Sequence, residues 1–129
     1  MKKFNKALKI AAKIHNGNKG GKNNPAILHP IRVMLKMDDQ LSRTVAILHD
    51  VVESGKMTVD DLRNQGFNNK ICLAVDLLSR RKWESYDHYI KRVKTNKLAI
   101  KVKIADLEDN YISRNNKKKL SKLDKSKIK

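Results

Sequence analysis

Ala46-Ile47-Leu48-His49-Asp50-Val51-Val52-Glu53 is the stretch on which the fold depends. Its apolar residues surround the axis of a predicted helix, which is typical of an interior helix, yet it also carries an imidazole and two carboxylates. Such groups in an apolar interior must be paired, protonated or bound to a metal. On a helix, Glu53 lies one turn beyond His49 and next to the face of Asp50, so the three side chains can converge. If a metal compensates them, further His or Asp ligands must come from elsewhere in the chain.

Apolar residues recur at helical spacing along the rest of the chain and never alternate as in a strand, which predicts an all-helical domain. The capping and breaking residues set the expected elements. We expect helices over residues 3–16, from His29-Pro30, from Asp38-Asp39 to Gly55, after the capping box Thr58-Val59-Asp60-Asp61, over 69–79, after Ser85 and after Asn96. A basic link, Ser79-Arg80-Arg81-Lys82, joins two of them, and residues 17–28 form a loop.

The chain has 129 residues, 40% of them hydrophobic, which suits one domain with a single core. It has no apolar run long enough to span a membrane, and we expect no cleavable leader, because lysines interrupt the apolar positions near its start. Its single cysteine, Cys72, lies in an apolar run and is expected in the core, which suits a reducing cytoplasm. We therefore expect a cytoplasmic protein with one folded domain over residues 1–114, and a lysine-rich, disordered tail over residues 115–129.

The net charge of +17 is concentrated at the two ends of the chain. Residues 1–37 carry +9 and residues 117–129 carry +6, which leaves +2 for the middle of the chain. Because the excess is mostly lysine with few aromatic residues beside it, nucleic-acid binding is possible and is not favoured. Two other interpretations of this positive charge remain. It forms a solvated lysine-rich surface, or it creates a positive field that attracts a polyanionic substrate.

Two further residues are candidate ligands for the same site as the central stretch. His29 stands between a loop and a helix, beside Pro30, where its ring can face inward. Asp106 shares one helix face with Lys103 and Asn110. Together with His49 and Asp50, these residues supply two imidazoles and two carboxylates, a donor set that suits Mn²⁺, Fe²⁺ or Zn²⁺.

The order His, His-Asp, Asp resembles that of the HD-domain metal-dependent phosphohydrolases. Four blocks narrow the resemblance to the hydrolase domain of the RelA/SpoT alarmone enzymes and their small stand-alone relatives, over residues from about 7 to 114. The blocks are Ala11-Ala12-Lys13-Ile14-His15, Pro25-Ala26-Ile27-Leu28-His29-Pro30, Leu48-His49-Asp50-Val51-Val52-Glu53 and Val102-Lys103-Ile104-Ala105-Asp106-Leu107-Glu108-Asp109-Asn110.

This resemblance implies an all-helical HD fold and removal of the 3′-pyrophosphate from (p)ppGpp, the nucleotide of the stringent response. It implies a divalent metal, usually Mn²⁺, held by His29, His49, Asp50 and Asp106. Glu53 would deprotonate the attacking water, and Asn110 would help to hold it. Phosphate oxygens would be neutralised by four basic residues: Lys103, Lys19, Arg80 and Arg81. The implied partner is a small phosphorylated nucleotide; oligomeric state is not implied.

Three positions depart from the family pattern. Ser54 replaces a usual aspartate, Ala26 replaces an aromatic residue, and Gly20-Gly21 replaces the basic pair that frames guanine. Two alternatives therefore stay open. One is an HD phosphohydrolase that acts on another phosphorylated nucleotide, and the other is a domain that binds a nucleotide or nucleic acid without turnover.

Overall fold

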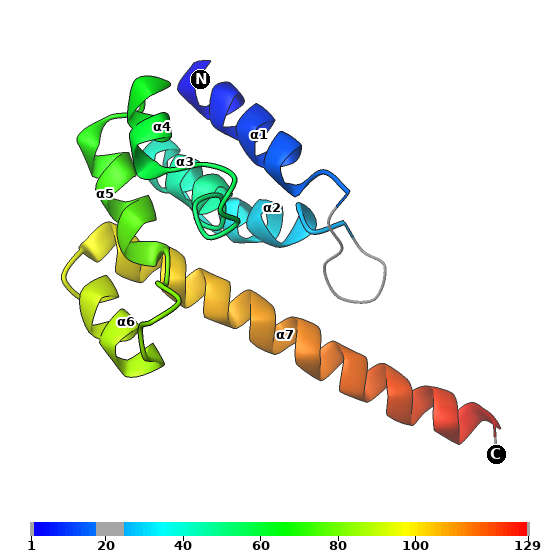
Figure 1. Ribbon diagram of the computed structural model, residues 1–129. Helices are drawn as coiled ribbons and strands as arrows, with labels where there is room; N and C mark the ends of the chain where they lie inside the picture. Colours follow the sequence, from blue (N-terminus) through cyan, green and yellow to red (C-terminus); the bar gives the residue numbers. More distant parts are fainter. Residues whose placement is uncertain (1, 18–24, 129) are drawn as a thin grey trace.

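A computed structural model describes residues 2–17 and 25–128, with side chains described as far as Ser113 (Figure 1). This part of the chain forms seven α-helices and no β-strand, so the all-helical prediction is confirmed for it. The helices are α1 Lys2–His15, α2 Leu28–Leu35, α3 Gln40–Leu48, α4 Val59–Asn64, α5 Asn69–Leu78, α6 Tyr86–Val93 and α7 Lys97–Ile128.

The predicted N-terminal caps account for where four helices begin. Asp39 accepts a hydrogen bond from the backbone N–H of Ser42 and starts α3. Thr58 and Asp61 form the reciprocal capping box of α4. The side chain of Ser85 accepts from the backbone N–H of His88 at the start of α6, and the side chain of Asn96 accepts from the third residue of α7 at 2.9 Å. Each cap satisfies a backbone donor that the helix itself leaves unpaired.

The central helix ends earlier than the sequence indicates. α3 stops at Leu48, whereas the apolar pattern predicted a helix as far as Gly55. Beyond Leu48 the backbone turns more tightly: the N–H of Val51 bonds to the Leu48 carbonyl, only three residues back. Gly55 then adopts a positive φ of 77°, which stops any further helix. The predicted helical register of His49, Asp50 and Glu53 is therefore wrong, and these residues lie on a compact turn.

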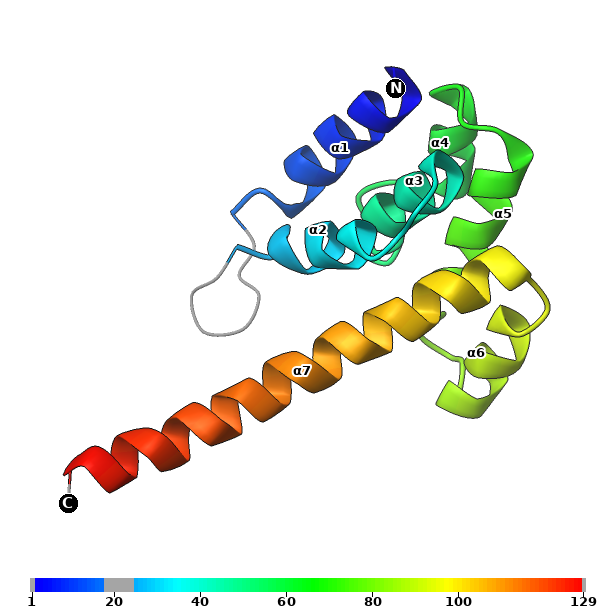
Figure 2. The ribbon, with the colours of Figure 1, turned by 180° about the vertical axis from the view of Figure 1, so that it is seen from behind.

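α3 is the central element of the bundle. Its residues Val45, Ile47 and Leu48 are fully buried, and the helix contacts α1, α2, α5 and α7. α7 crosses the molecule and also contacts α2, α5 and α6, which both views show (Figures 1 and 2). The C-terminal end of α3, the start of α2 and the first half of α7 are thereby brought together.

α7 extends well beyond the other helices, and its last turns project away from the bundle (Figure 2). It runs as a helix through Ile128, and the expected disorder of residues 115–129 stays a prediction. The expected domain boundary near residue 114 stays a prediction. Although α7 is 32 residues long, neither it nor any other described helix is apolar enough over a sufficient length to cross a membrane.

Candidate functional site

His49 lies directly after α3, and only 2% of its surface is exposed. Its Nδ1 atom lies 2.5 Å from the carbonyl oxygen of Ala46. Because a carbonyl oxygen can only accept, Nδ1 must carry a proton, and the lone pair of the neutral ring lies on Nε2. Nε2 is buried and has no hydrogen-bond partner among the described residues. When the ring is neutral, Nε2 can donate its electron pair to a ligand in the cluster.

His29 comes from the first turn of α2 and is held on both sides by carboxylates of α7. Its Nε2 lies 2.6 Å from Oδ1 of Asp106, and its Nδ1 lies 2.7 Å from Oδ2 of Asp109. Asp109 is fixed in turn by Arg32, which donates to both of its oxygens, at 2.8 and 3.1 Å. The orientation of the His29 ring is therefore determined by the Asp109–Arg32 pair behind it.

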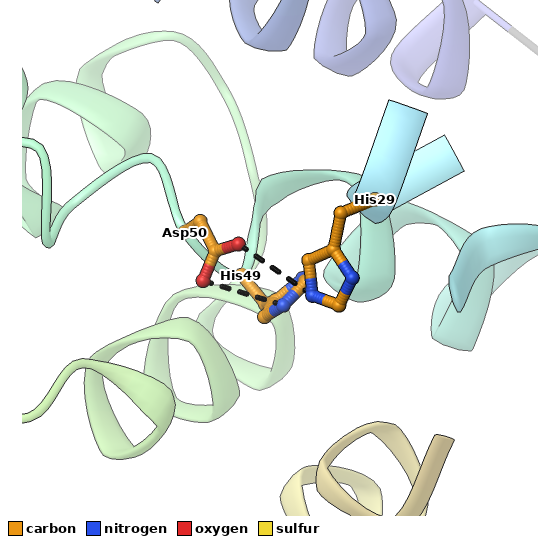
Figure 3. Close-up of side chains that lie close together, drawn as sticks. All are labelled: His29, His49 and Asp50. Carbon is orange, nitrogen blue, oxygen red and sulfur yellow. Dashed lines mark ion pairs between the residues drawn. The ribbon is translucent and has the colours of Figure 1, made fainter. Parts of the chain in front are cut away.

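Figure 3 shows His29, His49 and Asp50 facing one another, and one ligand atom from each lies within 4.8 Å of the others. The Nε2 atom of His49 is 3.3 Å from Oδ1 of Asp50 and 3.4 Å from Oδ1 of Asp106. The Nε2 atom of His29 is 4.0 Å from Oδ2 of Asp50. The structure thus brings the four residues proposed as ligands together from α2, the turn after α3, and α7.

The pKa shifts in this cluster have opposing causes. Burial alone lowers the pKa of His49, but the negative charges of Asp50 and Asp106 outweigh it and raise the pKa. The pKa of His29 is likewise raised by Asp106 and Asp109 against the effect of burial. Burial raises the pKa of Asp106, yet its contacts with His29, His49 and Lys103 hold it well below the ordinary value. Asp106 therefore stays ionised, and the two imidazoles beside it are stabilised in their protonated, cationic form.

A divalent cation would bind the same nitrogen and oxygen atoms in place of the protons on the imidazoles. The cluster offers imidazole nitrogen and carboxylate oxygen, the donor types that bind divalent transition metals. The unpartnered Nε2 of His49 is the observation that supports the fit, because a buried polar atom with no partner costs free energy unless something else binds it. His29, with its second nitrogen bonded to Asp109, has the carboxylate-backed arrangement usual for metal-binding histidines.

The cluster opens into a cleft of about 370 Å³. The four candidate ligands line this cleft, and so do four other predicted site residues: Glu53, Lys103, Arg80 and Asn110. The remaining lining residues are Leu78, Tyr86 and Tyr89. Glu53 accepts a hydrogen bond from the backbone N–H of Arg80 at 2.6 Å. Withdrawal from water raises the pKa of Glu53, and the negative charge of Asp50 adds to the increase. A carboxylate in this position is suited to accept a proton.

Lys103 occupies the wall of the cleft beside Asp106. Its Nζ atom donates to Oδ2 of Asp106 at 2.9 Å and lies 5.0 Å from the centre of the Tyr89 ring. Burial lowers the pKa of Lys103, but Asp106 and Tyr89 raise it overall, so the amine stays cationic. It can therefore offer positive charge to an anion in the cleft.

The two arginines of the basic link have different positions. Arg80 lines the cleft, with its guanidinium 5.7 Å from the centre of the Tyr86 ring. Arg81 points elsewhere: its guanidinium donates to the carboxylate and carbonyl of Asp76 and to the carbonyl of Ser79. Arg81 is thus occupied in holding the end of α5. Lys19 lies outside the described residues, as do Gly20 and Gly21.

Glu84 holds this link in place from inside the protein. Its side chain is fully buried and accepts from Arg92 at 2.5 and 2.6 Å, from the ring of His88 and from the backbone N–H of Arg81. Its carbonyl oxygen accepts from Nε of Arg80 at 3.1 Å, which orients that side chain. Glu84 therefore couples the start of α6 to the wall of the cleft.

Sequence reasoning missed Asp109, Arg32 and Glu84. Asp109 had one usable signal, because it lies three residues after Asp106 and so shares its helix face. A metal-binding histidine usually gives its second nitrogen to a carboxylate, which makes such a neighbour worth seeking. Arg32 and Glu84 had no comparable signal, because their partners lie far along the chain or in an irregular link.

The fold and the His/Asp cluster together define an all-helical, HD-type bundle. No model of a protein family matches the sequence, and no curated protein matches it either. Among solved structures, the chain is similar to a metazoan ortholog of SpoT, described as hydrolysing ppGpp and playing a role in starvation responses. The similarity has a TM-score of 0.71 with 25% sequence identity, and it covers 85% of this chain and 68% of that one. The chain therefore resembles a RelA/SpoT-like hydrolase domain.

Proposed function

We propose that this protein is a divalent-metal-dependent phosphohydrolase that removes the 3′-pyrophosphate from (p)ppGpp. The observation that carries the proposal is the buried Nε2 of His49, which makes no hydrogen bond to a described residue although two carboxylate oxygens, of Asp50 and Asp106, lie 3.3 and 3.4 Å from it. The structural similarity to a ppGpp-hydrolysing protein supports the choice of substrate. His29, His49, Asp50 and Asp106 are the proposed ligands, with Mn²⁺ as the preferred ion.

The reaction joins a water oxygen to the phosphorus next to the 3′-oxygen and breaks the bond between that phosphorus and the 3′-oxygen. Pyrophosphate is released, and the 3′-oxygen takes up a proton from water to become a hydroxyl. A divalent ion bound by the four ligands supplies a Lewis acid that polarises phosphoryl oxygen and makes water more acidic. Glu53 takes the proton of the attacking water, a role that its raised pKa favours. Lys103 and Arg80 neutralise the charge on the phosphate oxygens, and Asn110 orients the water from the neighbouring turn of α7.

One observation favours a second candidate, in which the substrate is another phosphorylated nucleotide. Ser54, which stands where the family usually has an aspartate, donates to the carbonyl of Val51 at 2.6 Å and accepts from the backbone of Lys56. It is absent from the residues that line the cleft. Position 54 therefore adds no carboxylate to the cleft, whereas the family pattern has an aspartate there.

The test is a turnover screen with metal-loaded protein and phosphorylated guanosine and adenosine compounds, including ppGpp. Glu53→Gln should lower kcat roughly 10²- to 10⁴-fold because it removes the base, while metal content, measured by elemental analysis, stays equal to wild type. Asp60→Asn is the matched control: Asp60 is exposed and pairs with Arg63 outside the cleft, so its activity should be unchanged.

The outcomes separate the candidates. Release of pyrophosphate and GDP from ppGpp supports the proposal, and turnover of a different nucleotide instead supports the second candidate. If Glu53→Gln hydrolyses ppGpp as fast as wild type, the assigned base is wrong. If no nucleotide is hydrolysed with any of Mn²⁺, Fe²⁺ or Zn²⁺, the chain is a binding domain without turnover.

A further inference from the structure

A second groove adjoins the cleft that holds the His/Asp cluster. It encloses about 700 Å³ between the start of α6 and the middle of α7. It is lined by Tyr86, Lys103, Leu107, Glu108, Asn110 and Tyr111. Tyr86, Lys103 and Asn110 also line the first cleft, so the two spaces lie next to each other at these side chains. A ligand longer than a phosphate group can therefore occupy both.

Half of the residues that line this groove are aromatic or aliphatic and exposed, and the other half, Lys103, Glu108 and Asn110, are charged or polar. Tyr111 is 68% exposed, Tyr86 46% and Leu107 44%. Leu107 and Tyr111 lie four residues apart on α7 and share one face, while Tyr86 stands opposite them as the first residue of α6. Tyr111 makes no hydrogen bond or ring contact with the side chains that the structure describes. Large apolar groups exposed beside a charged cleft are typical of a ligand-binding surface.

The chemistry of the two spaces is complementary. The first cleft contains the candidate metal ligands, Lys103 and Arg80, which suit phosphate groups. The second offers two aromatic rings and a leucine, which suit the faces of a planar, heteroaromatic base. Its volume lies within the range of small-molecule sites. Lys103 stands at the junction, where the phosphate and the nucleoside of one molecule would meet.

We propose that the groove between Tyr86, Leu107 and Tyr111 binds the nucleobase and ribose of the phosphorylated nucleoside whose phosphate group lies in the adjacent cleft. The base stacks on Tyr111, and Leu107 forms the floor. This inference rests on the proposed function, which places the phosphate end of the substrate in the first cleft. It adds that recognition of the nucleoside comes from stacking on α7 and α6, which accepts any base with a flat aromatic face.

The test compares two probes that differ in the nucleoside. Binding of ppGpp and of inorganic pyrophosphate is measured by calorimetry on Mn²⁺-loaded Glu53→Gln protein, to which Tyr111→Ala or Tyr111→Phe is added. Tyr111→Ala should weaken ppGpp binding about tenfold, as loss of one stacking partner does, and leave pyrophosphate binding unchanged. Tyr111→Phe keeps the ring and should stay within about twofold of its parent. Leu35→Ala, which removes an exposed apolar side chain of α2 outside both spaces, is the control.

The outcomes also separate this inference from the proposed function. If Tyr111→Ala leaves ppGpp binding unchanged while wild type hydrolyses ppGpp, the subsite is wrong and the hydrolase proposal stands. If wild type hydrolyses no nucleotide, yet Tyr111→Ala selectively weakens nucleotide binding, the subsite stands and the hydrolase proposal fails. The stacking role is overturned if Tyr111→Ala weakens the binding of ppGpp and of pyrophosphate equally. It is also overturned if Tyr111→Phe weakens ppGpp binding as much as Tyr111→Ala does.

Discussion

His49 and His29 face the same point but are fixed by different groups. The Nδ1 atom of His49 is committed to the Ala46 carbonyl within its own turn, whereas that of His29 is committed to Asp109, eighty residues away in the chain. In both cases the bond at Nδ1 leaves Nε2 directed into the cluster. The local bond is a property of the turn, and the distant one depends on how α2 packs on α7.

Asp109→Asn tests this orienting role. An amide in place of the carboxylate weakens the bond to Nδ1 of His29 and removes the ion pair with Arg32. We expect Mn²⁺ affinity, measured by competition with a chelator, to fall roughly 10- to 100-fold, as usual when the partner of a metal-bound histidine is lost. Glu108→Gln changes the adjacent carboxylate, which contacts Lys36 instead of His29, and should bind Mn²⁺ normally. Unchanged affinity in Asp109→Asn would remove Asp109 from the site.

At the scale of elements, the link between α5 and α6 shapes the cleft wall. The buried carboxylate of Glu84 holds Arg92, and Arg92 also donates to the carbonyl of Ser79 at the start of the link. The hydroxyl of Tyr89 donates to the carbonyl of Leu78 at 2.8 Å. These bonds from α6 replace the regular hydrogen bonds that an irregular segment lacks, and they set the position of Arg80.

Glu84→Gln tests whether this ion pair stabilises the link. Hydrogen bonds from Arg92 hold the pKa of Glu84 far below the ordinary glutamate value, so its ionised form favours the folded state. A carboxyl group whose pKa is lower in the folded state stabilises that state fully at pH values above its unfolded pKa of about 4.3. The stabilisation is lost as the pH falls below that value toward the folded pKa. We expect the variant to lower the thermal midpoint by roughly 5–10 °C at pH 7, and by less as the pH approaches 3.

The control for this measurement is Asp87→Asn, which changes an exposed acid on the same helix. It should change the midpoint by no more than a degree or two at either pH. A Glu84→Gln protein whose midpoint is lowered equally at pH 7 and pH 3 would show that the loss comes from packing, and that the charge of Glu84 is not the cause.

At the scale of the whole molecule, charge is divided unevenly. Residues 117–129 carry a net charge of +6, and they follow the half of α7 that holds Lys103 and Asp106. A positive field near a cleft raises the local concentration of a polyanionic substrate, and salt screens that effect. The alternative, a solvated lysine-rich surface, predicts no such dependence.

Deleting residues 117–129 distinguishes these interpretations. With a nucleotide substrate, the KM of the full chain should rise several-fold between 0.05 and 0.5 M salt, and the deletion should reduce that rise while kcat stays the same. A second protein keeps the full length but has the seven lysines of this segment replaced by glutamine, and it should behave like the deletion. A KM for the full chain that does not respond to salt would favour the solvated surface.

The sequence by itself determined the helical class, most helix starts and the identity of the clustered His and Asp residues. Helix starts depend on caps a few residues away, such as Asp39 with Ser42, and apolar spacing is likewise local. The four proposed ligands were found because their residue types are unusual in apolar surroundings and because their order resembles a known family.

Only the tertiary structure decided where α3 ends. It also decided that Arg80 lines the cleft while Arg81 turns to Asp76. The supporting roles of Asp109 and Glu84 likewise became visible only in the folded structure. The physical reason is that these outcomes depend on partners brought close by packing. Apolar periodicity cannot show that a helix stops at Leu48, since Val51 and Val52 continue the apolar pattern into the turn that follows. Equally, nothing local to Asp109 indicates that α2 will place His29 within 2.7 Å of it.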